Sequence, residues 1–497
     1  MRAPVRTLGI ALACAIGVAA CTPGGPGNGL PNIVIVVADD LGRRDVSFHG
    51  GELATPNIDR IAREGVALER FYSAPVCSPT RAGLLTGRYP IRYGLMRSVI
   101  PPWRDYGLDT DEVLLPELLA EAGYAERGIF GKWHLGHTSV RFHPLRRGFT
   151  EFVGHYNGGI DYFVHEREGE RDWQHGYTSV EEHGYSTDLL TDHAVDFIAR
   201  HAGQEAPFLL YVPYNAVHSP WQAREDILPR YADVPGIDLP PGHEEANEDI
   251  VAYVGDADGR REKRRITAAM GESLDTGVGR ILDALDEHGI ADNTFLLFFS
   301  DNGGVVGVGD NTPFRGAKAT VYEGGVRVAA AARWPAGGIS GGREVSAPVT
   351  YIDVLPTLLG IVGLEAPTER ALDGRDVLGV LTGSQDDTPR DLYSYVAVGS
   401  GAVEQVAVIE PEWKLVVVGP ELTEPGAAER SRLMLYAIAS DPYERDDMSG
   451  AHPEVVSRML EKAVAFRTLQ PPDAVPPYNA GREGFVAPSD WKAPDLP

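Results

Sequence analysis

Apolar runs along the chain alternate with segments that have the periodicity of amphipathic helices. Residues 32–38 form a continuous, mostly β-branched run, which is typical of a central parallel strand covered on both faces. Shorter apolar runs predict further strands at 127–131, 207–212, 294–300 and 326–333. Helical periodicity and end signals predict helices at 55–65, 115–122, 186–201 and 266–287. This alternation predicts an α/β fold in which helices flank a mostly parallel central sheet.

The pattern changes near residue 385. Three short apolar runs there predict a small antiparallel sheet, formed by a hairpin and one further strand, at 402–409, 413–418 and 433–438. A helix is predicted at 453–467, and the proline-rich tail after Leu469 is expected to lie extended over the surface. We therefore predict a large domain over residues 32–384 and a small C-terminal subdomain over residues 385–497.

The N-terminus has the features of an export signal. Arg2 and Arg6 precede an apolar run that is too short to span a membrane, so residues 1–20 are predicted to be a signal peptide. The run ends in Val-Ala-Ala-Cys21, which resembles the lipobox of bacterial lipoproteins, and residues 21–31 would then be a flexible tether. The alternative is ordinary cleavage that leaves Cys21 as a free thiol. We expect an exported lipoprotein of the cell envelope, in the outer membrane or periplasm, with membrane contact only through this lipid.

Charge and cysteine content narrow the candidate functions. The 45 basic and 71 acidic residues give a formal net charge of −26, which makes nucleic acid an unlikely partner. There are three cysteines: Cys14 lies in the predicted signal peptide, Cys21 is the candidate lipid anchor, and Cys77 remains. A single unpaired thiol is unusual in an exported protein. Cys77 is therefore either a buried residue that packs like a small apolar side chain or a residue that takes part in the chemistry of the protein.

Two predicted strands end in pairs of oxygen-bearing side chains. Asp39 and Asp40 follow the run at 32–38, and Asp301 and Asn302 follow the run at 294–300. Either pair alone could be a helix cap or a turn. Because ligands bind beyond the carboxyl ends of the strands in open α/β sheets, the two pairs together predict a site for a hard cation. Ca²⁺ is the first choice and Mg²⁺ the second, and zinc is disfavoured.

Cys77 begins the sequence Cys77-Ser-Pro-Thr-Arg81, which is followed by an apolar pair and Gly87. These residues predict a helix from about Ser78 to Gly87, with Cys77 at the N-terminus, where backbone N–H groups attract anions. Arg81 lies one turn further on, close enough to contact whatever Cys77 holds. Cys-x-Pro-x-Arg resembles the signature of the type I sulfatases, and the Leu-Leu-Thr-Gly-Arg-Tyr-Pro that follows is also similar to that family.

The resemblance extends over most of the chain. Four further segments are similar to family motifs, namely 131–136 with Lys132 and His134, 215–220 with His218, 314–327 with Lys318, and 435–444. Residues 146–149 and 158–166 resemble the N-acetylgalactosamine-4-sulfatase (arylsulfatase B-like) branch. Membership of the type I sulfatase family would imply a fold like that of the alkaline phosphatase superfamily.

The resemblance also implies a chemistry. In the family the cysteine, here Cys77, is oxidised by a maturation enzyme to formylglycine, whose hydrate attacks the sulfur of a sulfate ester. Carried over to this chain, the metal ligands would be Asp39, Asp40, Asp301, Asn302 and the modified Cys77. Arg81 would steady the nucleophile, Lys132 and Lys318 would neutralise sulfate oxygens, His218 would act as acid and His134 as base. The expected substrate is a sulfated carbohydrate, with 4-sulfated N-acetylgalactosamine as the candidate.

Two alternatives remain open at this point. The first is a formylglycine-dependent phosphonate monoester or phosphodiester hydrolase, which would share the Cys77 motif and much of the metal site. The second is a glycan-binding surface lipoprotein without turnover. The sequence does not indicate which sulfate position is cleaved, whether the action is exo or endo, or what the oligomeric state is.

Overall fold

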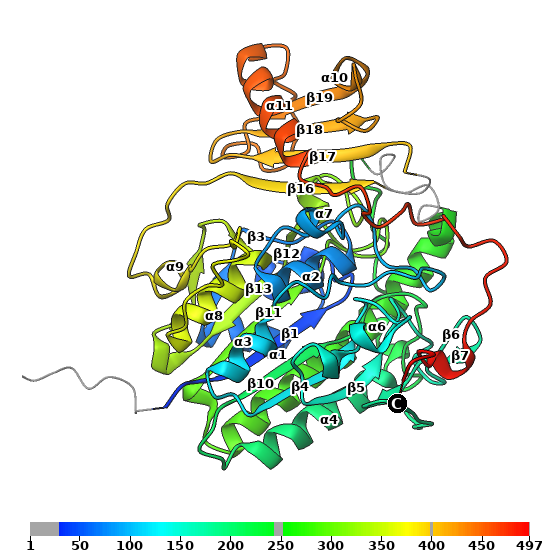
Figure 1. The fold of residues 1–497 in the computed structure, drawn as a ribbon, viewed down its shortest axis with the longest axis vertical. Coiled ribbons are helices and arrows are strands. Elements are labelled where there is room, and N and C mark those ends of the chain that lie inside the picture. Colours follow the sequence, from blue (N-terminus) through cyan, green and yellow to red (C-terminus); the bar gives the residue numbers. More distant parts are fainter. Residues whose placement is uncertain (1–28, 243–251, 398–400, 497) are drawn as a thin grey trace, which may run out of the picture.

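The computed structural model describes residues 29–242, 252–397 and 401–496. Its centre is a ten-stranded sheet in the order β14-β2-β13-β11-β1-β10-β4-β5-β8-β9 (Figure 1). The five middle strands, β11 to β5 in that order, are parallel. The strands of this sheet are β1 (Asn32–Ala38), β2 (Val66–Leu68), β4 (Glu126–Lys132), β5 (Glu151–His155), β8 (Gln174–His175), β9 (Thr178–Ser179), β10 (Phe208–Pro213), β11 (Thr294–Ser300), β13 (Ala330–Arg333) and β14 (Arg343–Val345).

Helices cover both faces of this sheet. Alternate residues of β1 point into two separate cores, with Ile33, Ile35 and Val37 in one and Val34, Val36 and Ala38 in the other. The first core is closed by α2 (Cys77–Thr86), α3 (Leu115–Glu121) and α8 (Val354–Val362). The second is closed by α1 (Pro56–Glu64), α4 (Ser186–His201) and α6 (Ala257–Glu287). The predicted α/β fold with a mostly parallel sheet is confirmed.

Two predicted elements differ from the structure. The run at 326–333 is not one strand, because β12 (Arg327–Val328) joins a small sheet with β3 (Phe71–Tyr72) and β15 (Val349–Thr350), while β13 joins the main sheet. The helix predicted to begin at Ile266 begins nine residues earlier, at Ala257. Its first turns are polar and carry no apolar stripe, and Asp256 caps them by accepting a hydrogen bond from the Gly259 amide at 2.9 Å.

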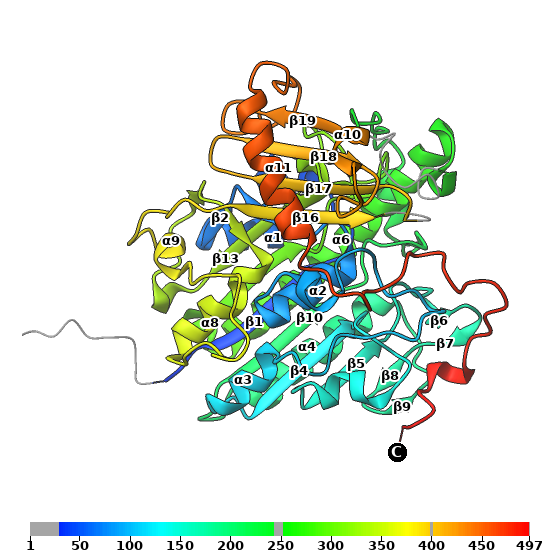
Figure 2. The ribbon, with the colours of Figure 1, turned by 45° about the horizontal axis from the view of Figure 1, so that its top comes forward.

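The C-terminal strands form a separate antiparallel sheet, β16-β17-β18-β19, which lies above the main sheet in Figure 1. Its strands are β16 (Leu392–Ala397), β17 (Glu404–Ile409), β18 (Lys414–Gly419) and β19 (Arg432–Tyr436). Helix α11 (Pro453–Arg467) lies across this sheet (Figure 2). The predicted antiparallel subdomain is thus confirmed as a fold element, and β16 is a strand that the sequence pattern did not reveal. The domain boundary near residue 385 stays a prediction.

The tail after Leu469 is extended, as expected, and runs down one side of the molecule toward β6 (Glu166–Arg167) and β7 (Glu170–Arg171) (Figure 1). The tail does not lie entirely on the surface, because Val475 and Trp491 are buried. The remaining short helices are α7 (Glu323–Val326), α9 (Leu378–Thr382) and α10 (Ala427–Arg430).

The predicted signal peptide and most of the tether lie outside the described residues. Within the described ranges, no helix has both the length and the apolar character needed to cross a bilayer.

Candidate active site

The carboxyl ends of neighbouring parallel strands bring the predicted oxygen ligands together. β1 and β11 pair in register, with Ala38 opposite Ser300, so Asp39 and Asp301 leave the sheet side by side. The Asp301 amide donates to the Ala38 carbonyl at 2.9 Å, which continues the pairing past the ends of the strands. Asp40 has a left-handed backbone (φ 60°) that turns the chain at this point. Asp39, Asp40, Asp301 and Asn302 are all buried.

Cys77 faces these residues from the first position of α2. Its Sγ lies 3.5 Å from Asp39 Oδ1 and 3.6 Å from Lys318 Nζ. The hydroxyl of Ser78 donates to the His134 carbonyl at 2.9 Å, and that of Thr80 donates to the Asp301 carbonyl at 2.6 Å. These two bonds fix the start of α2 to the carboxyl ends of β4 and β11. Burial and the nearby Asp301 carboxylate raise the pKa of the Cys77 thiol well above its usual value.

Arg81 joins the strand ends to one another. Its Nε and Nη2 donate to Asp301 Oδ2 at 3.1 and 2.8 Å, and its Nη1 donates to the Lys132 carbonyl at 3.0 Å. The same Nη2 lies 3.5 Å from Asp39 Oδ2. Because the guanidinium is planar and buried, it holds Asp301 and Asp39 in a fixed arrangement around Cys77.

The two predicted lysines neutralise the two aspartates at the end of β1. Lys132 Nζ is 2.5 Å from Asp39 Oδ2, and Lys318 Nζ is 2.6 Å from Asp40 Oδ1. Burial opposes ionisation, but Lys318 and His218 hold the pKa of Asp40 below its usual range. Burial lowers the pKa of Lys318 but Asp40 raises it more, so its ammonium group keeps its charge at the cavity wall, 3.6 Å from Cys77 Sγ.

The two predicted histidines lie on opposite loops beside this cluster. His218 Nε2 is 3.7 Å from Asp40 Oδ2, while its Nδ1 is 2.5 Å from the Ser219 carbonyl oxygen. His134 Nε2 is 3.1 Å from the Ile100 carbonyl oxygen. Its buried Nδ1 has no hydrogen-bond partner in the described structure. Burial lowers the pKa of both rings, helped by Lys318 at His218 and by Lys132 at His134.

A divalent cation fits between these residues. Ligand atoms of Asp39, Asp40, Cys77 and His218 all lie within 4.8 Å of one another. Asn302 Nδ2 donates to Asp40 Oδ1 at 2.7 Å, and Asn302 Oδ1 is buried without a hydrogen-bond partner in the described structure. A bound cation would satisfy this buried amide oxygen. The donor set of carboxylate and amide oxygens is that of Ca²⁺ or Mg²⁺.

The structure thus brings together every site residue predicted from the sequence, and their catalytic roles remain predictions. A cavity of about 480 Å³ opens above Cys77. It is also lined by side chains that no sequence motif indicated, and these are Arg167, Trp221, Tyr253, Tyr478 and Arg482. They reach the cavity from distant parts of the chain, so only the three-dimensional fold reveals them.

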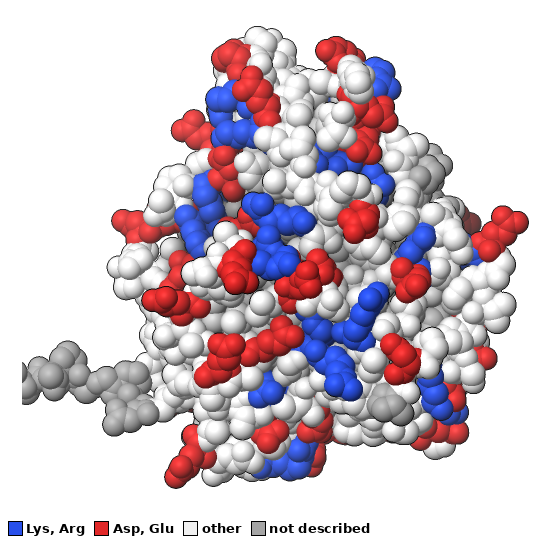
Figure 3. Space-filling view, viewed as in Figure 1, with Lys and Arg blue, Asp and Glu red and all other residues white. Residues whose placement is uncertain are grey.

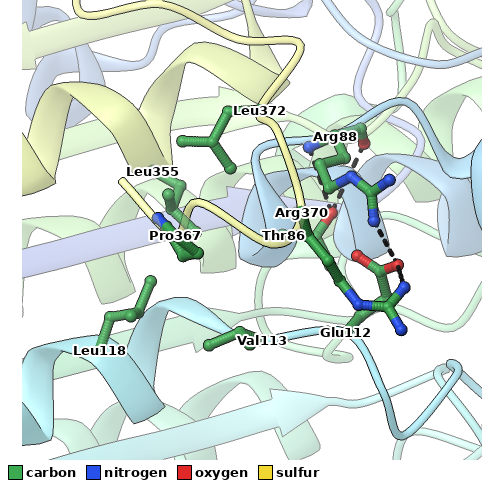
Figure 4. Close-up of a pocket in the computed structure, with 9 residues that line it drawn as sticks. All are labelled: Thr86, Arg88, Glu112, Val113, Leu118, Leu355, Pro367, Arg370 and Leu372. Carbon is green, nitrogen blue, oxygen red and sulfur yellow. Dashed lines mark hydrogen bonds and ion pairs between the residues drawn. The ribbon is translucent and has the colours of Figure 1, made fainter. Parts of the chain in front are cut away.

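A second hollow, near the far end of α2, is a poor candidate for a site. It is much smaller, about 10 Å³, and Arg88 and Arg370 both point to Glu112 in it (Figure 4). Glu112 Oε1 lies 2.5 Å from Arg88 Nη1 and 2.8 Å from Arg370 Nη1. These polar groups satisfy one another, which is the arrangement of a structural contact.

Known proteins resemble this chain in sequence and in fold. A family model described as Sulfatase matches residues 31–364. Arylsulfatase J of Mus musculus is 30% identical over 499 residues, which cover 91% of this chain and 78% of that protein. N-acetylgalactosamine-6-sulfatase of Mus musculus is 36% identical over 386 residues, which cover 72% of this chain and 68% of that protein.

Solved structures of other proteins have a similar fold. The crystal structure of Ps i-CgsB in complex with k-i-k-neocarrahexaose is 28% identical, with a TM-score of 0.75, and the match covers 89% of this chain and 94% of that one. The phosphonate monoester hydrolase of Agrobacterium radiobacter, 20% identical with a TM-score of 0.65 over 89% of this chain and 96% of that one, shares the fold alone. The predicted alkaline-phosphatase-like fold class is confirmed.

Proposed function

The chain belongs to the sulfatase family and is a sulfuric ester hydrolase, and on that premise we propose that it removes sulfate from a sulfated carbohydrate. Residue 77 would act as formylglycine, and a divalent cation, Ca²⁺ before Mg²⁺, would be held by Asp39, Asp40, Asp301, Asn302 and the modified residue 77. One observation carries this proposal. Cys77 Sγ lies between Asp39 and Lys318, at 3.5 and 3.6 Å, beside the cluster that fits a cation.

The oxidised residue would supply a hydrated aldehyde as nucleophile, and the cation would add positive charge beside the sulfate. The other roles belong to side chains in the structure. Lys132 and Lys318 stabilise negative charge on the sulfate oxygens, because fixed charges in a buried site need no reorganisation. His218 lies at the cavity wall and is our candidate for the acid that protonates the leaving oxygen. His134, whose Nδ1 is unpartnered within the described residues, is the candidate base.

The identity of the sulfated sugar is a more specific proposal. The motifs at 146–149 and 158–166 favour 4-sulfated N-acetylgalactosamine, whereas the relative at 36% identity is a 6-sulfatase of the same sugar. We therefore propose a sulfated N-acetylgalactosamine and test both positions. Initial rates on the 4-sulfated and 6-sulfated monosaccharides, measured under identical conditions, decide between them. Hydrolysis of neither sugar, with good activity on an aryl sulfate, would contradict this choice of sugar.

The alternative of a phosphonate or phosphodiester hydrolase is tested with matched substrates. We would compare kcat/KM for an aryl sulfate monoester with that for a phosphodiester and a phosphonate monoester of the same phenol. The proposal predicts a clear preference for the sulfate, and a preference for either phosphorus substrate would overturn it. Cation binding without turnover of any substrate, by protein shown to carry formylglycine, would favour the glycan-binding alternative.

The cation is tested apart from turnover. Protein stripped with a chelator is expected to have a lower melting temperature, and Ca²⁺ should restore it better than Mg²⁺, because a ligand that binds only the folded state stabilises it. Asn302→Ala should weaken this shift, whereas Asn479→Ala, in the same cavity but outside the cation cluster, should not. A melting temperature that no divalent cation changes would contradict the cation site.

Maturation and location are proposals from the sequence. We propose that a formylglycine-generating enzyme acts on the Cys-Ser-Pro-Thr-Arg segment before folding, because Cys77 is buried in the folded protein. We also propose that Cys21 is lipidated after export and that this lipid is the protein's only membrane anchor, at the outer membrane or in the periplasm.

A further inference from the structure

The cavity above Cys77 carries more positive charge than the sulfate chemistry uses. Among the described residues that line it, Asp40 is the only carboxylate, and Lys318 already pairs with it at 2.6 Å. Two further cationic side chains, Arg167 and Arg482, line the same cavity. The whole chain has a formal charge of −26, so a surplus of positive charge in this cavity is a local reversal.

Arg482 is positioned by a cation–π contact and not by an ion pair with a described carboxylate. Its guanidinium carbon lies 4.9 Å from the centre of the Trp103 ring, and Trp103 is itself fixed by donating to the Tyr478 carbonyl at 2.9 Å. Within the described residues, no carboxylate lies within ion-pair distance of Arg482, which is exposed. A cation–π contact leaves the edge of the guanidinium, with its N–H donors, free for an anion.

Arg167 lines the cavity near His218, and Gly159 lies between the two. Trp491 in the tail donates to the Arg167 carbonyl at 2.8 Å, and Arg167 Nη1 is 3.5 Å from the Gly159 carbonyl oxygen. Gly159 lies against His218, since a Cβ on Gly159 would come within 3.0 Å of His218 Nδ1. Two carboxylates act on the half-buried Arg167. That of the exposed Glu168 lies 3.4 Å away, and that of Asp172 is buried, with its pKa raised by burial and lowered again by Arg167.

We propose that Arg482 and Arg167 form a second anion subsite, which holds a sulfate or carboxylate group on a sugar residue beyond the sulfate that is cleaved. This inference rests on the proposed function and names its substrate class, an oligosaccharide with at least two anionic groups. The planar fork of arginine binds sulfate and carboxylate with two hydrogen bonds. Trp221 and Tyr253 line the same cavity, stacked with ring centres 5.3 Å apart and with Lys263 Nζ 5.6 and 5.9 Å from those centres, and we assign them as aromatic surface for a sugar ring.

The test compares three disaccharides that share one cleavable sulfate. The first has no other charge, the second has an additional sulfate on the neighbouring sugar, and the third has a carboxylate there. The quantity measured is the ratio of kcat/KM for each doubly charged substrate to that for the singly charged one. Arg482→Ala and Arg167→Ala are compared with wild type and with Arg430→Ala, which removes an exposed arginine of α10 from outside the cavity lining.

We expect wild type to favour a doubly charged disaccharide. Arg482→Ala should reduce that ratio by about 10- to 100-fold, mainly through KM, because a charge-assisted hydrogen-bond pair is lost. Arg482→Lys should reduce it less, since the charge remains but the fork is lost. Arg430→Ala should leave the ratio unchanged. The doubly charged substrate that shows the Arg482 effect identifies the bound group as sulfate or carboxylate.

Two results would count against the subsite in different ways. A ratio that neither Arg482→Ala nor Arg167→Ala changes overturns the subsite and leaves the proposed function intact. Wild-type protein that carries formylglycine but hydrolyses no sulfate ester, aryl or sugar, overturns the proposed function and the subsite with it.

Discussion

At residue 77 the proposed chemistry depends on a modification of the cysteine. The thiol is buried, and its raised pKa keeps it protonated, so an unmodified Cys77 would be a weak nucleophile. Yet Arg81, Lys132 and Lys318 surround it with the positive charge that an anionic substrate needs. A neutral group that becomes a nucleophile only after modification fits these surroundings better than a thiolate.

Cys77→Ser should end sustained turnover. A serine hydroxyl could accept sulfate once, but it has no second hydroxyl to expel the sulfate again. We expect steady-state kcat to fall by more than about 10³-fold, with at most one alcohol released per protein molecule. Release of alcohol, followed in time against protein concentration, checks this. Sustained turnover by the serine variant would contradict the proposed nucleophile.

The role of His218 is tested by changing the leaving group. If it protonates the leaving oxygen, His218→Ala should slow the hydrolysis of a sugar sulfate, a poor leaving group, by about 10²- to 10⁴-fold. It should slow an aryl sulfate with a strongly acidic phenol far less, because that oxygen leaves without a proton. Equal losses on both substrates would exclude this role and indicate a role in binding. His183→Ala, an exposed histidine away from the cavity, is the control.

At the scale of elements, a buried ion cluster ties the C-terminal sheet to the catalytic domain. Lys414 on β18 lies 2.9 Å from Glu323 Oε1 on α7 and 2.8 Å from Glu444 Oε1, and all three are buried. Burial raises the pKa of Glu444 to about 7, whereas Lys414 outweighs burial and lowers that of Glu323. The same segment, 314–327, carries Lys318, so this cluster supports the position of that lysine.

Lys414→Met should leave the buried carboxylate of Glu444 without its cation, whereas Glu323 would keep Arg327, whose Nη1 lies 3.5 Å from Glu323 Oε2. We expect the free energy of unfolding to fall by about 3–5 kcal/mol at neutral pH. Glu444 would keep its proton in the folded variant and lose it on unfolding, so stability should decrease as pH rises from about 5 to 8. Urea titrations across this range measure it. Arg430→Met, which breaks the exposed pair with Glu424, should cost no more than about 1 kcal/mol; an equal cost would contradict the account.

Strands with strong local signals could be predicted, and those defined by tertiary contacts could not. β1 and β11 match their predicted ranges, because both are continuous apolar runs buried on two faces. β16 was missed because residues 392–397 alternate weakly and follow a polar stretch. Cys77, Asp39 and Lys318 could be found because each lies in a local motif. Arg167 and Arg482 could not, because Arg167 in β6 and Arg482 in the tail meet the cavity only through the folding of distant segments.

At the scale of the whole molecule, the tail and the charge distribution shape access to the site. On the face shown in Figure 3, Lys and Arg side chains gather near the middle, between groups of Asp and Glu. The tail crosses from the C-terminal sheet to β7, and its residues Tyr478 and Arg482 line the cavity on the way. A protein with a net charge of −26 can thus present a positive cavity to an anionic substrate.

The proposed lipid on Cys21 would determine where the whole protein is located. Cys21→Ser should prevent lipidation, so the protein should move from the membrane fraction to the soluble fraction while kcat/KM on an aryl sulfate stays unchanged. Labelling cells with a tagged fatty acid and fractionating them checks both points. Equal labelling of wild type and the Cys21 variant would show that lipid, if present, is attached elsewhere; no labelling of wild type would contradict the anchor.

The most direct test of the central claim is a mass spectrum of the tryptic peptide Phe71–Arg81 from protein made in its native host. The account predicts a peptide that has lost H₂S and gained one oxygen atom relative to the cysteine form, and that reacts with an aldehyde-specific hydrazide. This would show formylglycine at position 77 in the protein whose sulfatase activity is then measured. A peptide found only with an intact cysteine, in protein that hydrolyses sulfate esters, would contradict the proposed nucleophile.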